Sequence, residues 1–175
     1  MKKFTMIILT VIILGTAAVA GEIVVGEKPP VLVLEGRQGG RLDNSAWSSE
    51  ELKDKVWCLF YVDPDESDLN VAAEDSLSAE DIPDDKLKTA AVINYKATIL
   101  PGFAVSMVLR GKQKDHPNTL YLKDNKHVFV DEWGLTDDTY CTLVFDKDGV
   151  LVYRKDGKMS DEDIEEYISV IKANL

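Results

Sequence analysis

Cysteine and histidine are scarce in this sequence. Its 175 residues contain two cysteines, Cys58 and Cys141, and two histidines, His116 and His127. The cysteines are 83 positions apart, which excludes a CxxC dithiol, a zinc-type Cys/His cluster and a fold stapled by several disulfides. Neither histidine has a neighbouring Ser or Cys with a following carboxylate, so no nucleophile triad is recognisable. Any thiol chemistry would therefore depend on a single cysteine.

Positive charge is also in deficit. The chain has 20 Lys and Arg against 31 Asp and Glu, which gives a formal net charge of −11 at pH 7. A protein of this charge is not expected to bind nucleic acid or an anionic membrane surface unaided. The acidic residues are scattered along the chain, which is typical of an ordinary solvated surface.

A long apolar run with a flanking charge pattern occurs only at the N-terminus. Lys2 and Lys3 precede the apolar residues 6–20, which end in Ala18-Val19-Ala20. This layout predicts a secretory signal peptide, residues 1–20, that is removed before Gly21. The run is shorter than the roughly 20 residues needed to span a bilayer, so we expect no stable membrane span afterwards. Without repeats or low-complexity linkers, residues 21–175 are expected to form one domain.

The interior of the chain contains one continuous apolar stretch, residues 56–62 (VWCLFYV). Seven apolar residues in a row predict a strand that is covered on both faces, in the middle of a mixed or parallel sheet. Further strands are predicted at 31–34, 88–94 and 127–130, and helices at 69–77 and 102–109, the second ended by Gly111. Residues 112–126 are predicted to be loop, apart from a short continuation at 120–122. His116 is expected to be solvated in this loop, and His127 to pack at a strand edge.

Residues 139–157 predict a β-hairpin. Two runs rich in β-formers, 142–145 and 150–154, flank a turn at 146–149 in which Gly149 can take a positive φ. Ser160 and Asp163 then form a capping box, and apolar residues recur at helical spacing at 164, 167, 168 and 171. Thioredoxin-like domains end with such a hairpin and helix. The whole pattern predicts an α/β three-layer sandwich, a mixed central sheet with helices on both faces.

The order of these segments resembles the YtfJ family of bacterial periplasmic proteins. The resemblance is carried by Trp47-Ser48 with Glu51-Leu52 ahead of the strand at 56–62, by AAVIN at 90–94 followed by Pro101-Gly102, by DEWGL at 131–135, and by the hairpin TLVFDKDGVLVYRKDG. It covers nearly all of residues 21–175. The resemblance implies a thioredoxin-like fold, a periplasmic location and no established reaction.

A thioredoxin-like fold implies two positions for redox chemistry, and the chain departs from both. The redox cysteine would follow the strand at 56–62, where the chain has the acidic segment 63–68 (DPDESD). A cis-proline would begin the hairpin, where the chain has Tyr140 next to Cys141. Both departures argue against thiol–disulfide exchange by the usual route.

The two cysteines remain the redox candidates. Cys58 lies inside an apolar run and is expected to be a buried, inert thiol. Cys141 lies at the start of a strand and is expected to be the more exposed of the two cysteines. We expect their strands to be antiparallel neighbours with Asp63, rather than Cys58, opposite Cys141, so a disulfide between the two cysteines would be awkward. The sequence does not decide whether they are free or paired.

The binding candidates are Asp63, Trp133 and Tyr140, with Tyr121 and Phe103 as further aromatic residues that could line a surface. For each aromatic residue, packing over the core is the competing interpretation.

A calcium-binding loop is a weaker interpretation of the acidic segment. Asp63, Asp65, Ser67 and Glu74 fall at positions 1, 3, 5 and 12 of an EF-hand-like loop. Pro64 and the lack of the glycine that such a loop needs make helix capping the better explanation. We therefore expect no metal and no cofactor.

The sequence thus predicts a periplasmic, redox-inactive thioredoxin-like protein that binds an envelope protein or peptide. The expected site is the end of the sheet formed by residues 63–67 and 131–141, because α/β folds bind ligands outside strand ends. The alternative is a single-cysteine oxidoreductase or peroxidase that uses Cys141, which would need a thiol pKa well below about 8.5. A purely structural or envelope-stress role is a third hypothesis.

Overall fold

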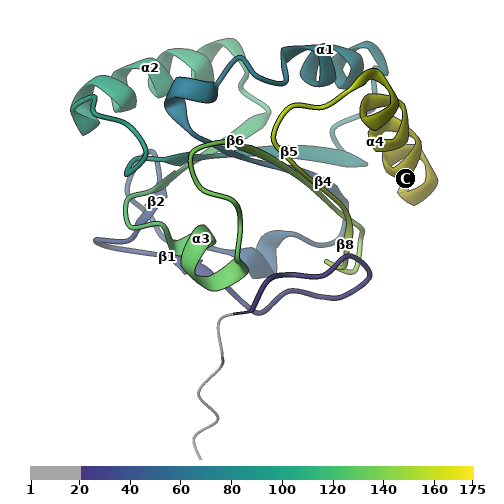
Figure 1. Ribbon diagram of the computed structural model, residues 1–175, viewed down its shortest axis with the longest axis horizontal. Coiled ribbons are helices and arrows are strands. Elements are labelled where there is room, and N and C mark those ends of the chain that lie inside the picture. The colour runs from purple at the N-terminus through teal and green to yellow at the C-terminus, as the bar shows by residue number, and fades with distance from the viewer. Residues whose placement is uncertain (1–20) are drawn as a thin grey trace, which may run out of the picture.

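A six-stranded mixed sheet forms the middle layer of the protein in the computed structural model (Figure 1). The structure describes residues 21–175, and the predicted signal peptide, residues 1–20, lies outside the described residues. The strand order is β2-β6-β5-β4-β7-β8, and β1 and β3 form a separate pair. The strands are β1 (Val33–Leu34), β2 (Gly39–Arg41), β3 (Trp47–Ser48), β4 (Val56–Val62), β5 (Leu87–Asn94), β6 (Thr119–Asp124), β7 (Tyr140–Phe145) and β8 (Leu151–Asp156). The helices are η1 (Ser49–Glu51), η2 (Pro64–Glu66), α1 (Val71–Ala79), α2 (Gly102–Asp115), α3 (Val128–Trp133) and α4 (Asp161–Asn174).

Strand β4 occupies the centre of the sheet, as its continuous apolar sequence predicts. It pairs in parallel with β5 and antiparallel with β7, so the sheet is mixed. Its side chains alternate between two apolar cores, with Cys58 and Phe60 in one and Leu59 and Tyr61 in the other. Because both faces of the strand are covered, neither face needs polar residues.

The two faces of the sheet are covered by different elements. Helices α1, α2 and α4 lie on one face, while α3 and the N-terminal segments with β1 and β3 lie on the other (Figure 1). The predicted three-layer sandwich is therefore confirmed. No helix in residues 21–175 is long and apolar enough to cross a membrane.

The C-terminal hairpin and helix form as predicted. Gly149 has a φ of +80°, which a residue without a side chain adopts at little cost in the turn between β7 and β8. The Ser160 side chain accepts a hydrogen bond from the Asp163 backbone N–H, and the Asp163 carboxylate accepts one from the Ser160 N–H. This capping box starts α4, whose Tyr167 and Ile171 are fully buried against the sheet.

Two predictions for residues 102–126 are wrong. Helix α2 does not end near Gly111 but continues to Asp115, because Gly111 is on the exposed side and Lys112 and Lys114 suit a helix C-terminus. The helix ends at Asp115, and its C-cap His116 is the residue before Pro117, where a helical conformation is disfavoured. The predicted loop at 112–126 also contains the six-residue strand β6, which pairs in parallel with β5.

The strand predicted at 127–130 is a helix, α3. The buried Asp124 carboxylate accepts hydrogen bonds from the backbone N–H groups of Lys126, Val128 and Phe129, which a helix start leaves without partners. His127 adopts a left-handed conformation, φ +61° and ψ +32°, immediately before the helix. A four-residue apolar pattern is too short to distinguish a strand from a helix. The hydrogen bonds to Asp124 favour the helix in this segment.

Candidate functional site

A groove of about 520 Å³ lies between α1 and α2 on one face of the sheet. Helix α1 packs beside α4, and α2 packs over β6 at the other side, so the part of β5 between them is left uncovered (Figure 1). The groove extends from Pro64 and Ser67, beyond the end of β4, to His116 and Thr119 at the start of β6.

The floor of the groove is mostly apolar. Alternate residues of β5 point into it, since successive side chains of a strand face opposite sides. These are Leu87, Thr89, Ala91 and Ile93, and Phe60, Val62 and Tyr121 extend the floor on either side. The span from Leu87 to Ile93 is about 20 Å at the usual rise of a strand. The Thr89 hydroxyl is hydrogen-bonded to that of Thr119 at 2.9 Å and adds one polar point to the floor.

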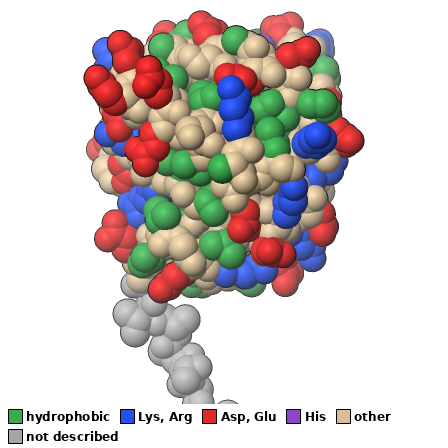
Figure 2. All heavy atoms as spheres, turned by 90° about the vertical axis from the view of Figure 1, so that its right-hand side faces the viewer, with side chains coloured by type: hydrophobic (Ala, Val, Ile, Leu, Met, Phe, Trp, Pro, Cys, Tyr) green, Lys and Arg blue, Asp and Glu red, His purple; other side chains and the backbone are tan. Residues whose placement is uncertain are grey.

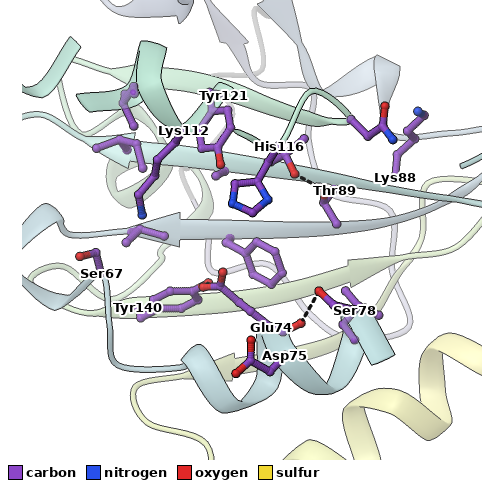
Figure 3. A pocket seen from close by; sticks show the side chains of 18 of the residues that line it. Ser67, Glu74, Asp75, Ser78, Lys88, Thr89, Lys112, His116, Tyr121 and Tyr140 are labelled. Atoms are coloured by element: carbon purple, nitrogen blue, oxygen red, sulfur yellow. Dashed lines mark hydrogen bonds between the residues drawn. The ribbon is translucent and has the colours of Figure 1, made fainter. Parts of the chain in front are cut away.

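The two walls of the groove carry opposite charges. Glu74 and Asp75 project from α1, while Lys112 and His116 project from the end of α2 on the opposite side (Figure 3). Asp81 and Asp84 extend the acidic wall. A ligand that lies along the groove therefore meets carboxylates on one side and the Lys112 ammonium and the His116 imidazole on the other.

Tyr140 marks the end of the groove near the carboxyl end of β4. Its hydroxyl donates a 2.7 Å hydrogen bond to the Glu74 carboxylate. Burial, and then the negative charge of Glu74, raise the pKa of Tyr140 well above its ordinary value. Tyr140 therefore stays neutral, and its hydroxyl holds Glu74 in place at the groove wall.

Two of the predicted binding residues lie at this end, and one does not. Asp63 is adjacent to the start of β7, because its backbone N–H donates to the Thr139 carbonyl at 3.0 Å. Its carboxylate accepts from the Asp65 N–H and starts η2, and burial raises the pKa of Asp63. Trp133 instead lies on the opposite face, 1% exposed, with its indole N–H donating to the Pro30 carbonyl. The structure therefore assigns Tyr140 to the groove, Asp63 to its neighbourhood and Trp133 to the other core.

The expected exposure of Cys141 is wrong. Both cysteines are free and have no exposed surface, and they belong to the cores on opposite faces of the sheet. The predicted register is also wrong by two residues, since Cys141 lies opposite Tyr61 and Asp63 lies beyond the paired segment. A disulfide between two side chains on opposite faces of one sheet cannot form without rebuilding the fold.

Burial is the main reason why the pKa values of both thiols are raised. It raises the pKa of Cys58 to about 12. It also raises the pKa of Cys141 to about 12, and the neighbouring Asp156 carboxylate contributes in the same direction. Reactive cysteines have the opposite environment, partly exposed and electropositive.

The Asp156 carboxylate beside Cys141 ties the hairpin to the loop before it. It accepts hydrogen bonds from Thr136 at 2.6 Å and from the Arg154 guanidinium at 2.8 Å. Burial opposes ionisation of Asp156, but these hydrogen bonds outweigh it and hold the pKa of Asp156 below its ordinary value. Arg154 also contacts Glu22 at 3.1 Å, which anchors the start of the described chain.

Replacing this carboxylate is expected to have a pH-dependent effect. Asp156→Asn should lower the free energy of unfolding by about 1–2 kcal/mol at pH 7. A depressed pKa in the folded state stabilises above the unfolded-state pKa, near 3.8, and the gain is lost as the pH falls through the folded value. Urea unfolding at pH 7 and pH 3 should therefore show a smaller gap between wild type and variant at pH 3. The exposed Glu35→Gln is the control, and an equal gap at both pH values would contradict the assignment.

Sequence reasoning missed most of the groove. The sequence pattern places Glu74 only in an unlikely metal loop. It predicts that Lys112 and His116 belong to a loop, because the predicted helix ends at Gly111. The alternation in residues 87–93 was visible in the sequence, but it did not reveal that α1 and α2 leave this side of the strand open. Within residues 21–175, no His, Cys, Asp or Glu side chains are grouped as three or more metal ligands.

Comparison with known proteins places the chain among related sequences. A family model described as "Bacterial protein of unknown function (YtfJ_HI0045)" matches residues 23–174. The chain is 24% identical over 175 residues to "Uncharacterized protein YtfJ" of Escherichia coli strain K12, covering 95% of each chain. It is 29% identical over 129 residues to an uncharacterized protein of Haemophilus influenzae, covering 71% of this chain and 70% of the relative.

Solved structures with the same fold are more distant in sequence. A putative thioredoxin from Neisseria meningitidis superposes with a TM-score of 0.60 at 18% identity, covering 85% of this chain and 92% of the other. A thiol peroxidase from Chromobacterium violaceum gives a TM-score of 0.61 at 12% identity, covering 89% of this chain and 90% of the other. These similarities confirm the predicted thioredoxin-like fold, and at this identity they show the fold alone.

Proposed function

We propose that this chain, which belongs to the YtfJ_HI0045 family of bacterial proteins and has a thioredoxin-like fold, acts by binding an extended peptide segment rather than by thiol chemistry. The observation that carries the proposal is the groove between α1 and α2. It begins at Pro64 and Ser67, directly after the strand whose end holds the redox cysteine in thioredoxin-like enzymes. The chain's own thiols lie elsewhere, inside the two cores.

The shape of the groove favours a peptide. Its floor follows β5 for about 20 Å, which matches the length of roughly six extended residues. An apolar floor accepts apolar side chains that point toward the sheet, and the side chains between them point toward the two walls. The acidic wall at Glu74 and Asp75 and the basic wall at Lys112 and His116 then favour a segment with a basic residue on one side and an acidic residue on the other.

A single-cysteine enzyme is the competing function. It needs a thiol that a substrate can reach and that ionises near neutral pH. The burial of Cys141 and its raised pKa argue against both requirements. Redox inactivity is accordingly part of the proposal.

The proposed location is the periplasm, where the predicted signal peptide would deliver the chain. The supporting observation is the sequence of residues 1–20, in which two lysines precede an apolar run that ends in Ala18-Val19-Ala20. Fractionation of cells that express the chain, followed by N-terminal sequencing, should give a periplasmic protein that begins at Gly21. A protein retained in the cytoplasm with Met1 intact would contradict it.

Filling the groove floor should weaken peptide binding. Ala91 is a small, partly buried floor residue, so Ala91→Phe places a ring in the space that the peptide needs. We expect the affinity for fluorescent octapeptides with alternate apolar residues, one Lys and one Glu to fall by about tenfold or more, measured by fluorescence anisotropy.

The matched control is Ala72→Phe, an exposed position of α1 outside the groove lining. It should bind these peptides like the wild type, and both variants should unfold at similar urea concentrations. Equal binding by Ala91→Phe and wild type, or no binding of any such peptide to the wild type, would contradict the proposed function.

A further inference from the structure

An apolar surface is exposed where the chain enters α2. It consists of Ile99 and Leu100 in the preceding loop and Phe103 and Met107 in the first two turns, and is called the α2 apolar surface below. Ile99 is 98% exposed, Phe103 73% and Met107 69%. Single exposed apolar residues are ordinary, but here four large ones fall within nine positions of the chain.

Helix geometry places this surface on the outer side of α2. The inner side is defined by the buried Val105 and Leu109. Residues spaced by three and four positions share one face of a helix, so Phe103 and Met107 continue into Arg110 and Lys114, both exposed. None of these four residues lines the groove between α1 and α2. The outer face of α2 is therefore apolar in its first half, basic in its second half, and separate from the proposed peptide site.

Helix α2 and the loop before it carry a net positive charge, unlike the whole protein. Residues 96–115 contain four Lys and Arg and one Asp, although the chain carries a net charge of −11. By contrast, acidic and basic side chains are mixed on the face shown in Figure 2. Arg110 and Lys114 share a helix face with Phe103 and Met107, so two exposed cations continue the α2 apolar surface. Screening at physiological ionic strength reduces the effect of charges more than about 8 Å away.

We infer that the α2 apolar surface docks onto an anionic phospholipid bilayer. Ile99, Leu100, Phe103 and Met107 would enter the interface between headgroups and acyl chains, and nearby cations would pair with lipid phosphates. A helix with exposed apolar residues and flanking Lys and Arg is the usual arrangement for such peripheral binding. The supporting cations are Lys96, Arg110 and Lys114, all exposed.

A bilayer suits this surface better than a folded partner does. The apolar residues are 52–98% exposed. They belong to α2 and the loop before it, and α2 lies at the edge of the molecule (Figure 1). A protein partner would need a complementary hollow to cover them, whereas a lipid interface adapts to projecting side chains. The sequence-based expectation of no unaided binding to an anionic membrane was based on net charge. The clustering of positive charge around α2 removes the basis of that expectation.

Vesicle binding tests this inference directly. Residues 21–175 contain every described strand and helix, so this form is used, without residues 1–20. It should co-sediment with vesicles of phosphatidylethanolamine and phosphatidylglycerol at least about tenfold more tightly than with pure phosphatidylcholine vesicles. Binding should weaken as salt is raised from 50 to 500 mM, since salt screens the cations.

Two double variants separate the apolar and charged contributions. Phe103→Ser with Met107→Ser should lower the partition coefficient by about tenfold or more, because both side chains enter the interface. Arg110→Gln with Lys114→Gln should lower it several-fold and flatten the salt dependence. The matched control, Val31→Ser with Lys158→Gln, replaces one exposed valine and one exposed lysine away from α2 and should bind like the wild type.

Three results would overturn the inference. The first is equal binding to anionic and neutral vesicles, and the second is unchanged binding by the Phe103→Ser, Met107→Ser variant. The third is a wild-type protein that is dimeric and does not bind vesicles, together with a variant that is monomeric. The last result would assign the α2 apolar surface to self-association. All four substituted α2 residues are exposed, so thermal unfolding should be nearly unchanged, and peptide binding in the groove can be measured on the same proteins as an independent readout.

Discussion

Iodoacetamide at pH 8 is expected to leave both thiols of the native protein unmodified under conditions that alkylate an unfolded chain within minutes. The pKa of Cys58 and that of Cys141 are each raised from 9.0 to about 12, mainly by burial. A rise of this size lowers the thiolate fraction by about a thousandfold, and the thiolate is the species that reacts. Burial on opposite faces of the sheet also denies the reagent access.

Mass spectrometry before and after addition of urea measures this directly. No added mass is expected in native protein, and two alkyl groups are expected after unfolding. In the same assay, the unfolded Cys141→Ser variant should carry one alkyl group, which identifies the remaining site as Cys58. Rapid labelling of Cys141 in the native protein would contradict the assignment and favour the alternative, a single-cysteine enzyme. Peroxide turnover would then be the next assay.

Loss of the Asp124 carboxylate is expected to have the largest effect on stability. Asp124 is fully buried and accepts hydrogen bonds from three backbone N–H groups at 3.0 Å and from the Tyr61 hydroxyl at 3.3 Å. Asp124→Ala leaves these buried donors without an acceptor at the start of α3. We expect the free energy of unfolding to fall by about 3–4 kcal/mol, which corresponds to a melting temperature lower by about 10 °C.

Urea unfolding followed by circular dichroism gives the value, and Tyr61→Phe is the matched control. This control removes one hydrogen bond to the same carboxylate and keeps the ring, which stacks on Phe129 at 5.4 Å, so it should cost only about 1 kcal/mol. A cost for Asp124→Ala no larger than that of Tyr61→Phe would show that α3 starts without this carboxylate. It would then remove the physical reason given for the helix at 128–133.

The proposed peptide binding and the proposed membrane docking involve different sides of α2. Lys112 and His116 face the groove, while Phe103 and Met107 face outward. A bilayer beneath the outer side would leave the groove open. Each proposal can therefore fail without the other, because the variants that test them share no residue.

Local patterns predicted a large part of the fold. The apolar run 56–62 became β4 with the same boundaries, because seven apolar side chains can be buried only if both faces of a strand are covered. The turn with Gly149 and the Ser160 capping box likewise depend on neighbours within a few residues. The resemblance to the YtfJ family, based on order and spacing, agreed with the match of the family model to residues 23–174.

The incorrect predictions concerned segments whose structure depends on distant residues. Residues 127–130 are helical because the carboxylate at the end of β6 holds their backbone. Cys141 is buried because it lies opposite Tyr61 on a covered face of the sheet. The predicted register placed Asp63 opposite Cys141, which is two residues from the observed pairing. Helix α2 continues through Gly111 because Val105 and Leu109 anchor it to the sheet, which outweighs the roughly 1 kcal/mol cost of a helical glycine.

By itself, the sequence determined the fold class, the absence of a dithiol, the central strand β4 and the C-terminal hairpin with its helix, because these follow from composition and from periodicities of two and 3.6 residues. Tertiary structure alone decided which side chains are reachable. The groove exists because α1 and α2 pack on β4–β6 without meeting over Ala91. The α2 apolar surface is exposed because no other element of residues 21–175 covers it. Exposure is a property of what packs against a residue, and those neighbours come from parts of the chain that are far away in sequence.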